Sequence, residues 1–212
     1  MPARRKPPKP TTIAFVRHGQ TPTTGKVLPG RARGLHLADQ GRAQARAAAD
    51  RLGAYGKVAA IYASPLERTR ETAAPIAKAL GLRVTVERGL LECDFGEWTG
   101  RELKELYKLP EWQQVQRTPS MFRFPEGESF LEMQARTSDA VRRIVAAHPG
   151  EVVVCVSHAD PIKVVVADAM GSHLDHFQRF GVSPCSITVI AYSAAGPNVL
   201  CVNSTDTLPG AA

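Results

Sequence analysis

The chain alternates between short apolar runs and longer segments in which apolar residues recur at helical spacing. Six runs rich in β-branched residues predict strands, at residues 13–16, 58–62, 83–86, 152–156, 187–192 and 199–202. Four segments between them predict helices, at residues 41–52, 66–80, 129–147 and 162–170. Strands that alternate with helices are typical of an α/β fold. We therefore expect a three-layer sandwich, with a mostly parallel central sheet and helices on both faces.

The same pattern separates the centre of the sheet from a less regular region. Runs 13–16 and 152–156 are almost continuously apolar, as central strands covered on both faces are. Residues 93–128 contain no long periodic segment and are interrupted by three prolines, Pro110, Pro119 and Pro125. We expect this region to form a cap or insertion beside the functional site. The predicted organisation is one domain at 12–206, a disordered basic, proline-rich tail at 1–11 and a flexible C-terminus at 207–212.

Composition is that of a soluble globular domain, with 43% hydrophobic and 22% charged residues among 212. The formal charge of +7 would suit a nucleic-acid-binding protein. Four of those charges lie in the tail, at Arg4, Arg5, Lys6 and Lys9, and the rest of the chain carries +3. We expect a small anionic substrate and no nucleic-acid partner; binding of nucleic acid through the tail is an alternative that deleting residues 1–10 would test.

Targeting signals and cysteine spacing add little to this picture. No apolar stretch follows the basic N-terminal residues, and no run of about 18 apolar residues occurs, so we expect a cytoplasmic protein without a membrane partner. The four cysteines show no CxxC pair, which favours reduced structural thiols. The last strands offer a sheet edge through which a homodimer could form.

Candidate chemistry follows the two central strands directly. Arg17, His18 and Gly19 come after the first strand, and His158 occupies the equivalent position after the run at 152–156. In open α/β sheets ligands bind beyond the C-terminal ends of the strands, so the two imidazoles should face each other if these strands are neighbours. A neutral imidazole can attack phosphorus, a guanidinium can bind two phosphate oxygens, and a glycine lets backbone N–H groups approach. A lone histidine after a strand is more often a core or loop residue, so the context of this motif matters.

That context resembles the histidine phosphatase superfamily, also called the phosphoglycerate mutase-like family, whose signature is RHG after the first strand. The resemblance continues through YASPLERTRETA at 62–73, LLECDFGEWTG at 90–100, PEGES at 125–129 and VSHADPIK at 156–163. Five segments in the family's order cover nearly all of the chain after the tail. The resemblance implies phosphoryl transfer with no cofactor and no metal.

The resemblance also implies a role for each matching residue. His18 would be the nucleophile, Glu92 the proton donor to the leaving oxygen, and the other catalytic residues would bind the transferring phosphoryl group: Arg17, Arg68 and His158. Further substrate-binding positions are Gly19, Gln20, Thr21, Thr24 and Ala159. Thr24 stands where the family's mutases usually carry Asn, and Ala159 where Gly is common.

Some assignments have alternatives. Asp94 is the fallback for the proton donor. A metal site at His18, His158 and Glu92 is conceivable, but two adjacent guanidiniums would oppose a dication. Ser64 is expected to be structural or a helix cap. Asp39 and Asp160 are expected to cap the helices that begin near residue 40 and near Pro161.

Phosphatases and mutases of this family form the same phosphohistidine, so the catalytic residues do not distinguish the two activities. The segment between Glu92 and the GES sequence at 127–129 is where they differ. In the family's mutases this region is long and carries paired arginines for the substrate carboxylate. Here residues 93–126 are shorter and carry isolated arginines, at Arg101, Arg117 and Arg123. This favours a metal-independent phosphomonoester hydrolase that acts on a small phosphorylated metabolite. A phosphoglycerate mutase-type phosphotransferase is the alternative, and a catalytically silent phosphate-binding scaffold is the second alternative.

Overall fold

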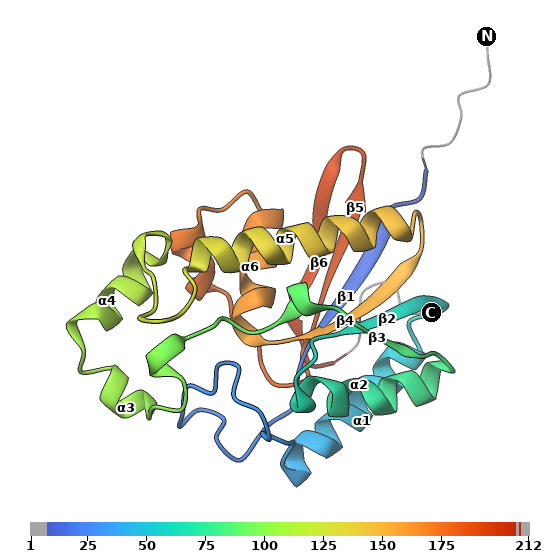
Figure 1. The fold of residues 1–212 in the computed structure, drawn as a ribbon. Helices are drawn as coiled ribbons and strands as arrows, with labels where there is room; N and C mark the ends of the chain where they lie inside the picture. Colours follow the sequence, from blue (N-terminus) through green and yellow to red (C-terminus); the bar gives the residue numbers. More distant parts are fainter. Residues whose placement is uncertain (1–7, 207, 209–212) are drawn as a thin grey trace.

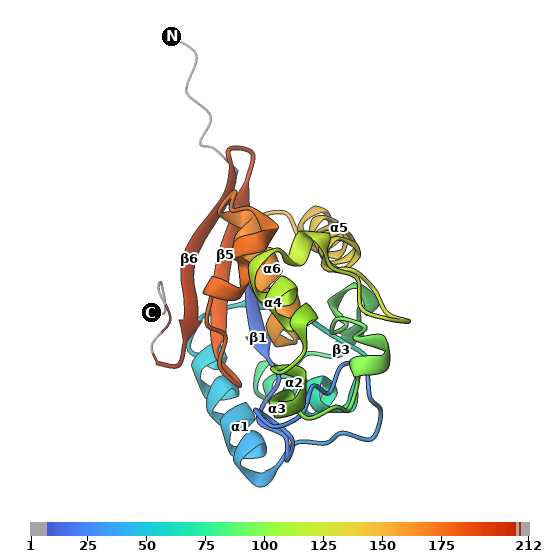
Figure 2. The same cartoon turned by 90° about the vertical axis from the view of Figure 1, so that its left-hand side faces the viewer.

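A six-stranded sheet lies at the centre of the protein, in a computed structural model that describes residues 8–206 and 208 (Figure 1). Its strands are β1 (Thr11–Arg17), β2 (Val58–Ala63), β3 (Val84–Val86), β4 (Val152–Ser157), β5 (Ile187–Ser193) and β6 (Gly196–Ser204). Their order in the sheet is β3-β2-β4-β1-β5-β6. The first four are parallel, and β5 and β6 form an antiparallel hairpin at one edge (Figure 2). The predicted α/β class and mostly parallel sheet are confirmed.

Two pairs of helices cover the two faces of the sheet. Helices α1 (Asp39–Gly53) and α2 (Glu67–Leu80) lie on one face, and α5 (Phe130–Ala147) and α6 (Ala159–Ala169) lie on the other (Figure 1). Alternate residues of β1 therefore enter different cores: Ala14 and Val16 pack with α1 and α2, whereas Ile13 and Phe15 pack with α5 and α6. Burial on both faces explains the unbroken apolar runs of β1 and β4.

The irregular region forms short helices beside the sheet, to the left in Figure 1. These are η2 (Gly96–Trp98), α3 (Leu103–Leu106), α4 (Pro110–Arg117) and η3 (Pro119–Met121); two more 3₁₀ turns, η1 (Arg88–Leu90) and η4 (Leu174–Arg179), lie elsewhere. Pro110 and Pro119 each start a helix, where the missing N–H is not needed. Aromatic rings of this region pack on one another and on the start of α5; the ring centroids of Phe124 and Phe130, for example, are 5.2 Å apart. The insertion is thus held by a hydrophobic core that it shares with α5, α6 and η4.

The ends of several elements differ from the prediction. Thr11, assigned to the tail, is a buried residue of β1, and Leu208, assigned to a flexible C-terminus, is buried in the core with α1. Residues 8–10 of the predicted tail are exposed and belong to no helix or strand, and residues 1–7, 207 and 209–212 lie outside the described residues. Asp39 does not cap α1, because Ala38 occupies the N-cap position without a side-chain bond.

Helix α6 also starts earlier than predicted. His158 is its N-cap and Ala159 its first residue, so Asp160 lies in the first turn and does not cap the helix. An acidic side chain there still interacts favourably with the positive helix end. None of the helices in the described part of the chain is both long and apolar enough to cross a membrane. The four cysteines are free, and three of them, including Cys155, are buried as the sequence indicates.

Candidate active site

The parallel register of β1 and β4 brings the two predicted histidines together. Arg17 is paired with Ser157 at the ends of these strands, and the backbone N–H of His18 donates to the Ser157 carbonyl at 2.9 Å. The next residues, His18 and His158, have ring centroids 5.2 Å apart and planes at 64°. Both side chains are buried. The expectation that two histidines meet across the strand ends is confirmed.

The backbone of the next residue selects one tautomer of His18. Its Nδ1 lies 2.8 Å from the Gly19 carbonyl oxygen, which can only accept a hydrogen bond. Nδ1 therefore carries the ring proton, and Nε2 keeps its lone pair. Burial first, and then the charges of Arg68 and Arg17, hold the pKa of His18 well below its ordinary 6.5. The ring is neutral near pH 7, which is the state that a nucleophilic imidazole needs.

His158 is held by a residue that the sequence suggested to be only structural. Its Nε2 lies 2.8 Å from the Ser64 hydroxyl, directly after β2, and its Nδ1 is buried without a protein partner. Burial, followed by the charge of Arg68, lowers the pKa of His158 well below 6.5 as well. A Ser64 hydroxyl that donates to Nε2 leaves the proton on Nδ1, the nitrogen available for an anion. Ser64 thus orients a candidate catalytic ring, although no local sequence signal points to that role.

Two guanidiniums next to the histidines have donors to spare. Arg68, in the first turn of α2, is fully buried, and its Nη2 donates to the Gly30 carbonyl at 2.7 Å. Its Nε and Nη1 have no protein partner. Arg17 donates from Nη1 to the Val182 carbonyl at 2.6 Å, and its buried Nε is also unpartnered. Buried charged donors are normally paired, so these groups and Nδ1 of His158 are suited to hold an anion.

Glu92 is the buried carboxyl of this cluster. It is 6% exposed, and one of its oxygens accepts the Cys93 N–H at 3.0 Å. Burial is the main reason why the pKa of Glu92 rises from 4.5 to about 7; the nearby charge of Asp160 adds to the rise, while Arg68 and Arg17 oppose it. A carboxyl group that keeps a proton near neutral pH can act as a general acid.

The fallback acid is placed differently. The Asp94 side chain is 41% exposed, is paired with Arg31 at 3.2 Å, and does not line the cavity at His18. The geometry therefore favours Glu92 over Asp94 as the proton donor.

A cavity of about 240 Å³ lies at the ends of β1 and β4. Six of the predicted site residues line it: Arg17, His18, Thr21, Thr24, Glu92 and Ala159. The hydroxyls of Thr21 and Thr24 lie 3.0 Å apart, and Ala159 is the first residue of α6. The loop before α1 and the insertion contribute apolar residues to the lining: Val27, Leu28, Pro29, Phe95 and Leu103.

Two predicted substrate-binding residues have other partners and do not line this cavity. The Gly19 N–H donates to Thr72 Oγ1 at 3.0 Å. A Cβ on Gly19 would lie 2.5 Å from the Gly41 carbonyl oxygen, so the glycine permits close contact with α1 and does not present its N–H to a phosphate. The Gln20 N–H donates to Gln44 Oε1 at 2.9 Å. Both residues position the loop after β1 by packing.

Two charged residues at the cavity were not predicted to bind substrate. Asp160 and Lys163 line it from the first turns of α6, and the Lys163 ammonium lies 3.4 Å from Asp160 Oδ1. They belong to VSHADPIK, a segment that the sequence had already singled out. Their i, i+3 spacing on a helix that begins at His158 could have indicated their place.

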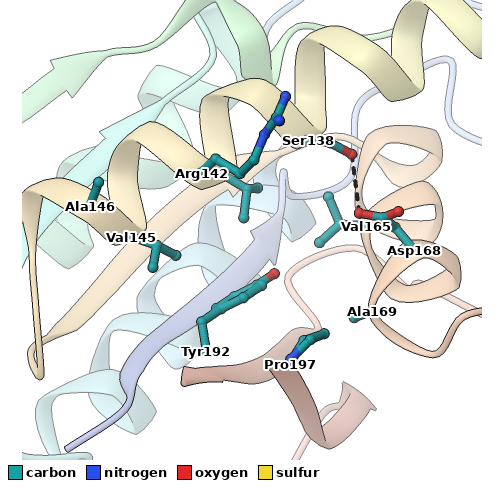
Figure 3. Close-up of a pocket in the computed structure, with 10 residues that line it drawn as sticks. Ser138, Arg142, Val145, Ala146, Val165, Asp168, Ala169, Tyr192 and Pro197 are labelled. Atoms are coloured by element: carbon teal, nitrogen blue, oxygen red, sulfur yellow. Dashed lines mark hydrogen bonds between the residues drawn. The ribbon is translucent and has the colours of Figure 1, made fainter. Parts of the chain in front are cut away.

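A larger cavity of about 480 Å³ lies between α5, α6 and the β5–β6 hairpin (Figure 3). Aliphatic side chains such as Val145 and Val165 form much of its lining, and the Ser138 hydroxyl lies 3.3 Å from Asp168 Oδ2 at its rim. Its lining residues include no histidine or cysteine that could serve as a nucleophile. Of the candidate catalytic residues, Arg17, His18 and Glu92 line the smaller cavity. Arg68 and His158 are fully buried and are not among its lining residues, although the His158 ring lies next to that of His18.

The donor set of the smaller cavity bears on the metal alternative. Within residues 8–206 and 208, no group of three His, Cys, Asp or Glu side chains is arranged to hold a metal ion. Two guanidiniums beside the histidines make the site a better match for an anion than for a dication. Metal independence stays a prediction that chelation can test.

Comparison with known proteins places these residues in a family. Residues 13–205 match the histidine phosphatase superfamily (branch 1). The bifunctional protein Rv2228c of Mycobacterium tuberculosis (strain ATCC 25618 / H37Rv) is 33% identical over 204 residues, which cover 92% of this chain and 54% of that protein. The chain thus spans about half the length of the first curated relatives that it matches. Phosphoserine phosphatase 1 of Hydrogenobacter thermophilus is 33% identical over 166 residues, with 76% and 78% covered.

Two more comparisons agree with this. The probable phosphoglycerate mutase GpmB of Cronobacter sakazakii is 31% identical over 183 residues, with 85% of this chain and 84% of that protein covered. Among solved structures, the mycobacterial glucosyl-3-phosphoglycerate phosphatase in complex with VO3 has a TM-score of 0.81 and 26% identity, covering 91% of this chain and 98% of the other. Since the match extends over residues 13–205 and includes both histidines at the ends of β1 and β4, the chain belongs to the histidine phosphatase superfamily.

Proposed function

We propose that the protein hydrolyses phosphomonoesters of a small metabolite through a phosphohistidine formed on His18, without a metal ion. The observation that carries the proposal is the state of His18: Nδ1 is committed to the Gly19 carbonyl, and the pKa is held well below 6.5. The ring therefore offers a neutral Nε2 beside buried donors of Arg17, Arg68 and His158 that have no protein partner.

In the first step, Nε2 of His18 attacks phosphorus and the bond from phosphorus to the ester oxygen breaks. Arg17, Arg68 and His158 bind the non-bridging oxygens and balance their negative charge. The leaving oxygen takes the proton of Glu92, since an alkoxide is a poor leaving group without one. The alcohol leaves, and His18 carries the phosphoryl group while Glu92 is ionised.

In the second step, water attacks the phosphohistidine. The Glu92 carboxylate accepts a proton from that water, the N–P bond breaks, and inorganic phosphate is released. His18 and Glu92 return to their starting states. The electrostatic partners are the same in both steps, because the transferring group is the same.

Two features favour hydrolysis over mutase activity. Arg101, Arg117 and Arg123 are exposed and do not line the cavity, so the insertion brings no pair of arginines to a substrate carboxylate. Relatives named as phosphatases support the same choice, and their printed substrates, phosphoserine and glucosyl-3-phosphoglycerate, are the first candidates for this chain. The relative named as a probable mutase keeps the alternative open to test.

The test is a panel of phosphorylated metabolites, including phosphoserine, glucosyl-3-phosphoglycerate and 3-phosphoglycerate, assayed for free phosphate and for isomerised product. We expect free phosphate and no isomer. Acid-labile, base-stable labelling by a ³²P-labelled substrate should appear on the unchanged protein and be absent from His18→Ala. Hydrolysis that survives in a folded His18→Ala variant would refute the nucleophile, and isomer without phosphate would identify a mutase.

A further inference from the structure

The segment that carries Glu92 is held by a set of three charged residues that the proposed mechanism does not use. We call them the Arg–Glu–Arg clamp: Arg31, Glu128 and Arg136. The backbone carbonyl of Glu92 accepts from Arg31 Nε at 2.9 Å and from Arg136 Nη2 at 3.0 Å. Two guanidiniums thus converge on one peptide group, that of the candidate proton donor.

Glu128 joins the two arginines. Its Oε2 accepts from Arg31 Nη2 and from Arg136 Nε, both at 3.0 Å, and its Oε1 accepts from Arg136 Nη2 at 2.6 Å. The same Oε1 accepts the backbone N–H of Asp94 at 3.1 Å. Glu128 therefore fixes this segment in two ways: it binds the two arginines that donate to the Glu92 carbonyl, and it accepts the backbone N–H of Asp94, two residues further along the chain.

Both arginines also hold neighbouring backbone. Arg136 donates from Nη1 to the Gly89 and Leu91 carbonyls at 3.0 and 2.8 Å. Arg31 follows Gly30, whose carbonyl accepts from the phosphate-site residue Arg68 at 2.7 Å. The clamp thereby links the backbone of the proton donor to the loop that fixes an arginine of the anion site.

The clamp is largely withdrawn from solvent, and its charges are balanced locally. The side chains are 29%, 13% and 22% exposed for Arg31, Glu128 and Arg136, and Arg31 is also paired with Asp94. Burial alone would raise the pKa of Glu128, but the hydrogen bonds and charges of the arginines hold it below its ordinary value, so the carboxylate is ionised at neutral pH. Two positive and two negative groups can hold the Glu92 backbone without leaving an unpaired charge beside it.

We propose that the Arg–Glu–Arg clamp is a positioning device that holds Glu92 where its carboxyl reaches the leaving oxygen, so that protonation of poor leaving groups depends on it. Direct hydrogen bonds to the carbonyl of the proton donor, from residues 61 and 44 positions away along the chain, support this reading. Glu128 belongs to PEGES, a segment of the family resemblance to which the sequence assigned no role. The inference rests on the proposed function, because it takes Glu92 as the acid.

A comparison of leaving groups tests the proposal. The p-nitrophenolate of p-nitrophenyl phosphate leaves with little help from an acid, whereas the alkoxide of an alkyl phosphate needs a proton. We would measure kcat/KM, which reports the steps up to loss of the leaving group, for p-nitrophenyl phosphate and for the alkyl phosphate that the unchanged protein hydrolyses best. The variants are Glu128→Gln, Arg31→Lys and Glu92→Gln, with circular dichroism to check folding.

We expect Glu128→Gln and Arg31→Lys to lower kcat/KM for the alkyl ester by about 10-fold or more beyond any loss with p-nitrophenyl phosphate, because a misplaced acid affects only the step that needs it. An ammonium at position 31 keeps the charge but cannot bridge the same three acceptors as a guanidinium. The control Glu105→Gln breaks an exposed ion pair with Lys108 in which neither residue lines the cavity or contacts the clamp, and it should change neither value.

The outcomes separate the two proposals. Suppose that Glu92→Gln lowers kcat/KM more for the alkyl ester than for p-nitrophenyl phosphate, but that the clamp variants lower both values equally or leave both unchanged. The positioning proposal is then wrong, and the proposed acid stands. If Glu92→Gln does not discriminate, the acid assignment itself fails. If neither clamp variant folds, the clamp serves stability alone and the positioning role is overturned.

Discussion

Replacing Glu92 by Gln should make the protein less active and, at high pH, more stable. The carboxyl is 6% exposed, and the pKa of Glu92 rises from 4.5 to about 7 mainly through burial. Ionised Glu92 is therefore a buried charge that lowers the stability of the fold. A glutamine has nearly the same shape, can accept the Cys93 N–H in the same way, and never ionises.

The magnitude follows from linkage between protonation and folding. Between about pH 4.5 and 7 the folded protein keeps a proton that the unfolded chain releases, so this carboxyl lowers the free energy of unfolding as pH rises through that window. The rise in pKa corresponds to about 3 kcal/mol, and most of it, about 2–3 kcal/mol, falls between about pH 5 and pH 8. Glu92→Gln removes this pH-dependent loss of stability. The difference in the free energy of unfolding between the variant and the unchanged protein should therefore grow by the same amount from about pH 5 to about pH 8.

The assay is urea unfolding of both proteins at about pH 5 and about pH 8, followed by circular dichroism. The difference between the free energies of unfolding of the two proteins at each pH cancels the titration of all other groups. The matched control is Glu97→Gln in the same segment, where the side chain is exposed and the difference should not grow with pH. Activity toward an alkyl phosphate should fall by about 10²–10⁴-fold in Glu92→Gln. In the unchanged protein, kcat/KM should decline above about pH 7, as Glu92 loses its proton.

The reasoning is refuted if the stability difference between Glu92→Gln and the unchanged protein is the same at both pH values. That result would mean that the carboxyl is solvated or is ionised at both. An unchanged rate with the alkyl ester would refute the role of acid separately. The two measurements therefore test the burial of the group and its chemistry independently.

Three other results are expected. Gly19→Ala should lower the free energy of unfolding by about 1–3 kcal/mol, because the added methyl would lie 2.5 Å from the Gly41 carbonyl oxygen. The control is Gly53→Ala, at a glycine with open space around it, and equal effects of the two substitutions would contradict the packing argument. Ser64→Ala should lower kcat about 10-fold with a smaller change in KM, because His158 loses the hydroxyl that orients it; a full rate in steady-state assays would show that this bond is dispensable. Treatment with EDTA should leave the rate unchanged, whereas a loss that Mg²⁺ or Zn²⁺ restores would disprove metal independence.

The elements, and the meeting of two histidines at the ends of β1 and β4, were predictable from the sequence because both depend on local patterns. Apolar periodicity located β1 and β4, and the positions directly after them identified His18 and His158. The motif around Glu92 was local too. Errors fell at element ends, where packing decides: Ala38 and not Asp39 is the N-cap of α1, and Leu208 is buried.

By itself, then, the sequence determined the α/β class and the chemical types of the groups at the strand ends. Only the tertiary structure decided how those groups are held. The contact of Ser64 with His158 spans 94 positions, and the bond from Arg31 to Glu128 spans 97. Burial, tautomer and pKa arise from atoms brought together by such distant contacts, and the periodicity of a single segment carries no information about them.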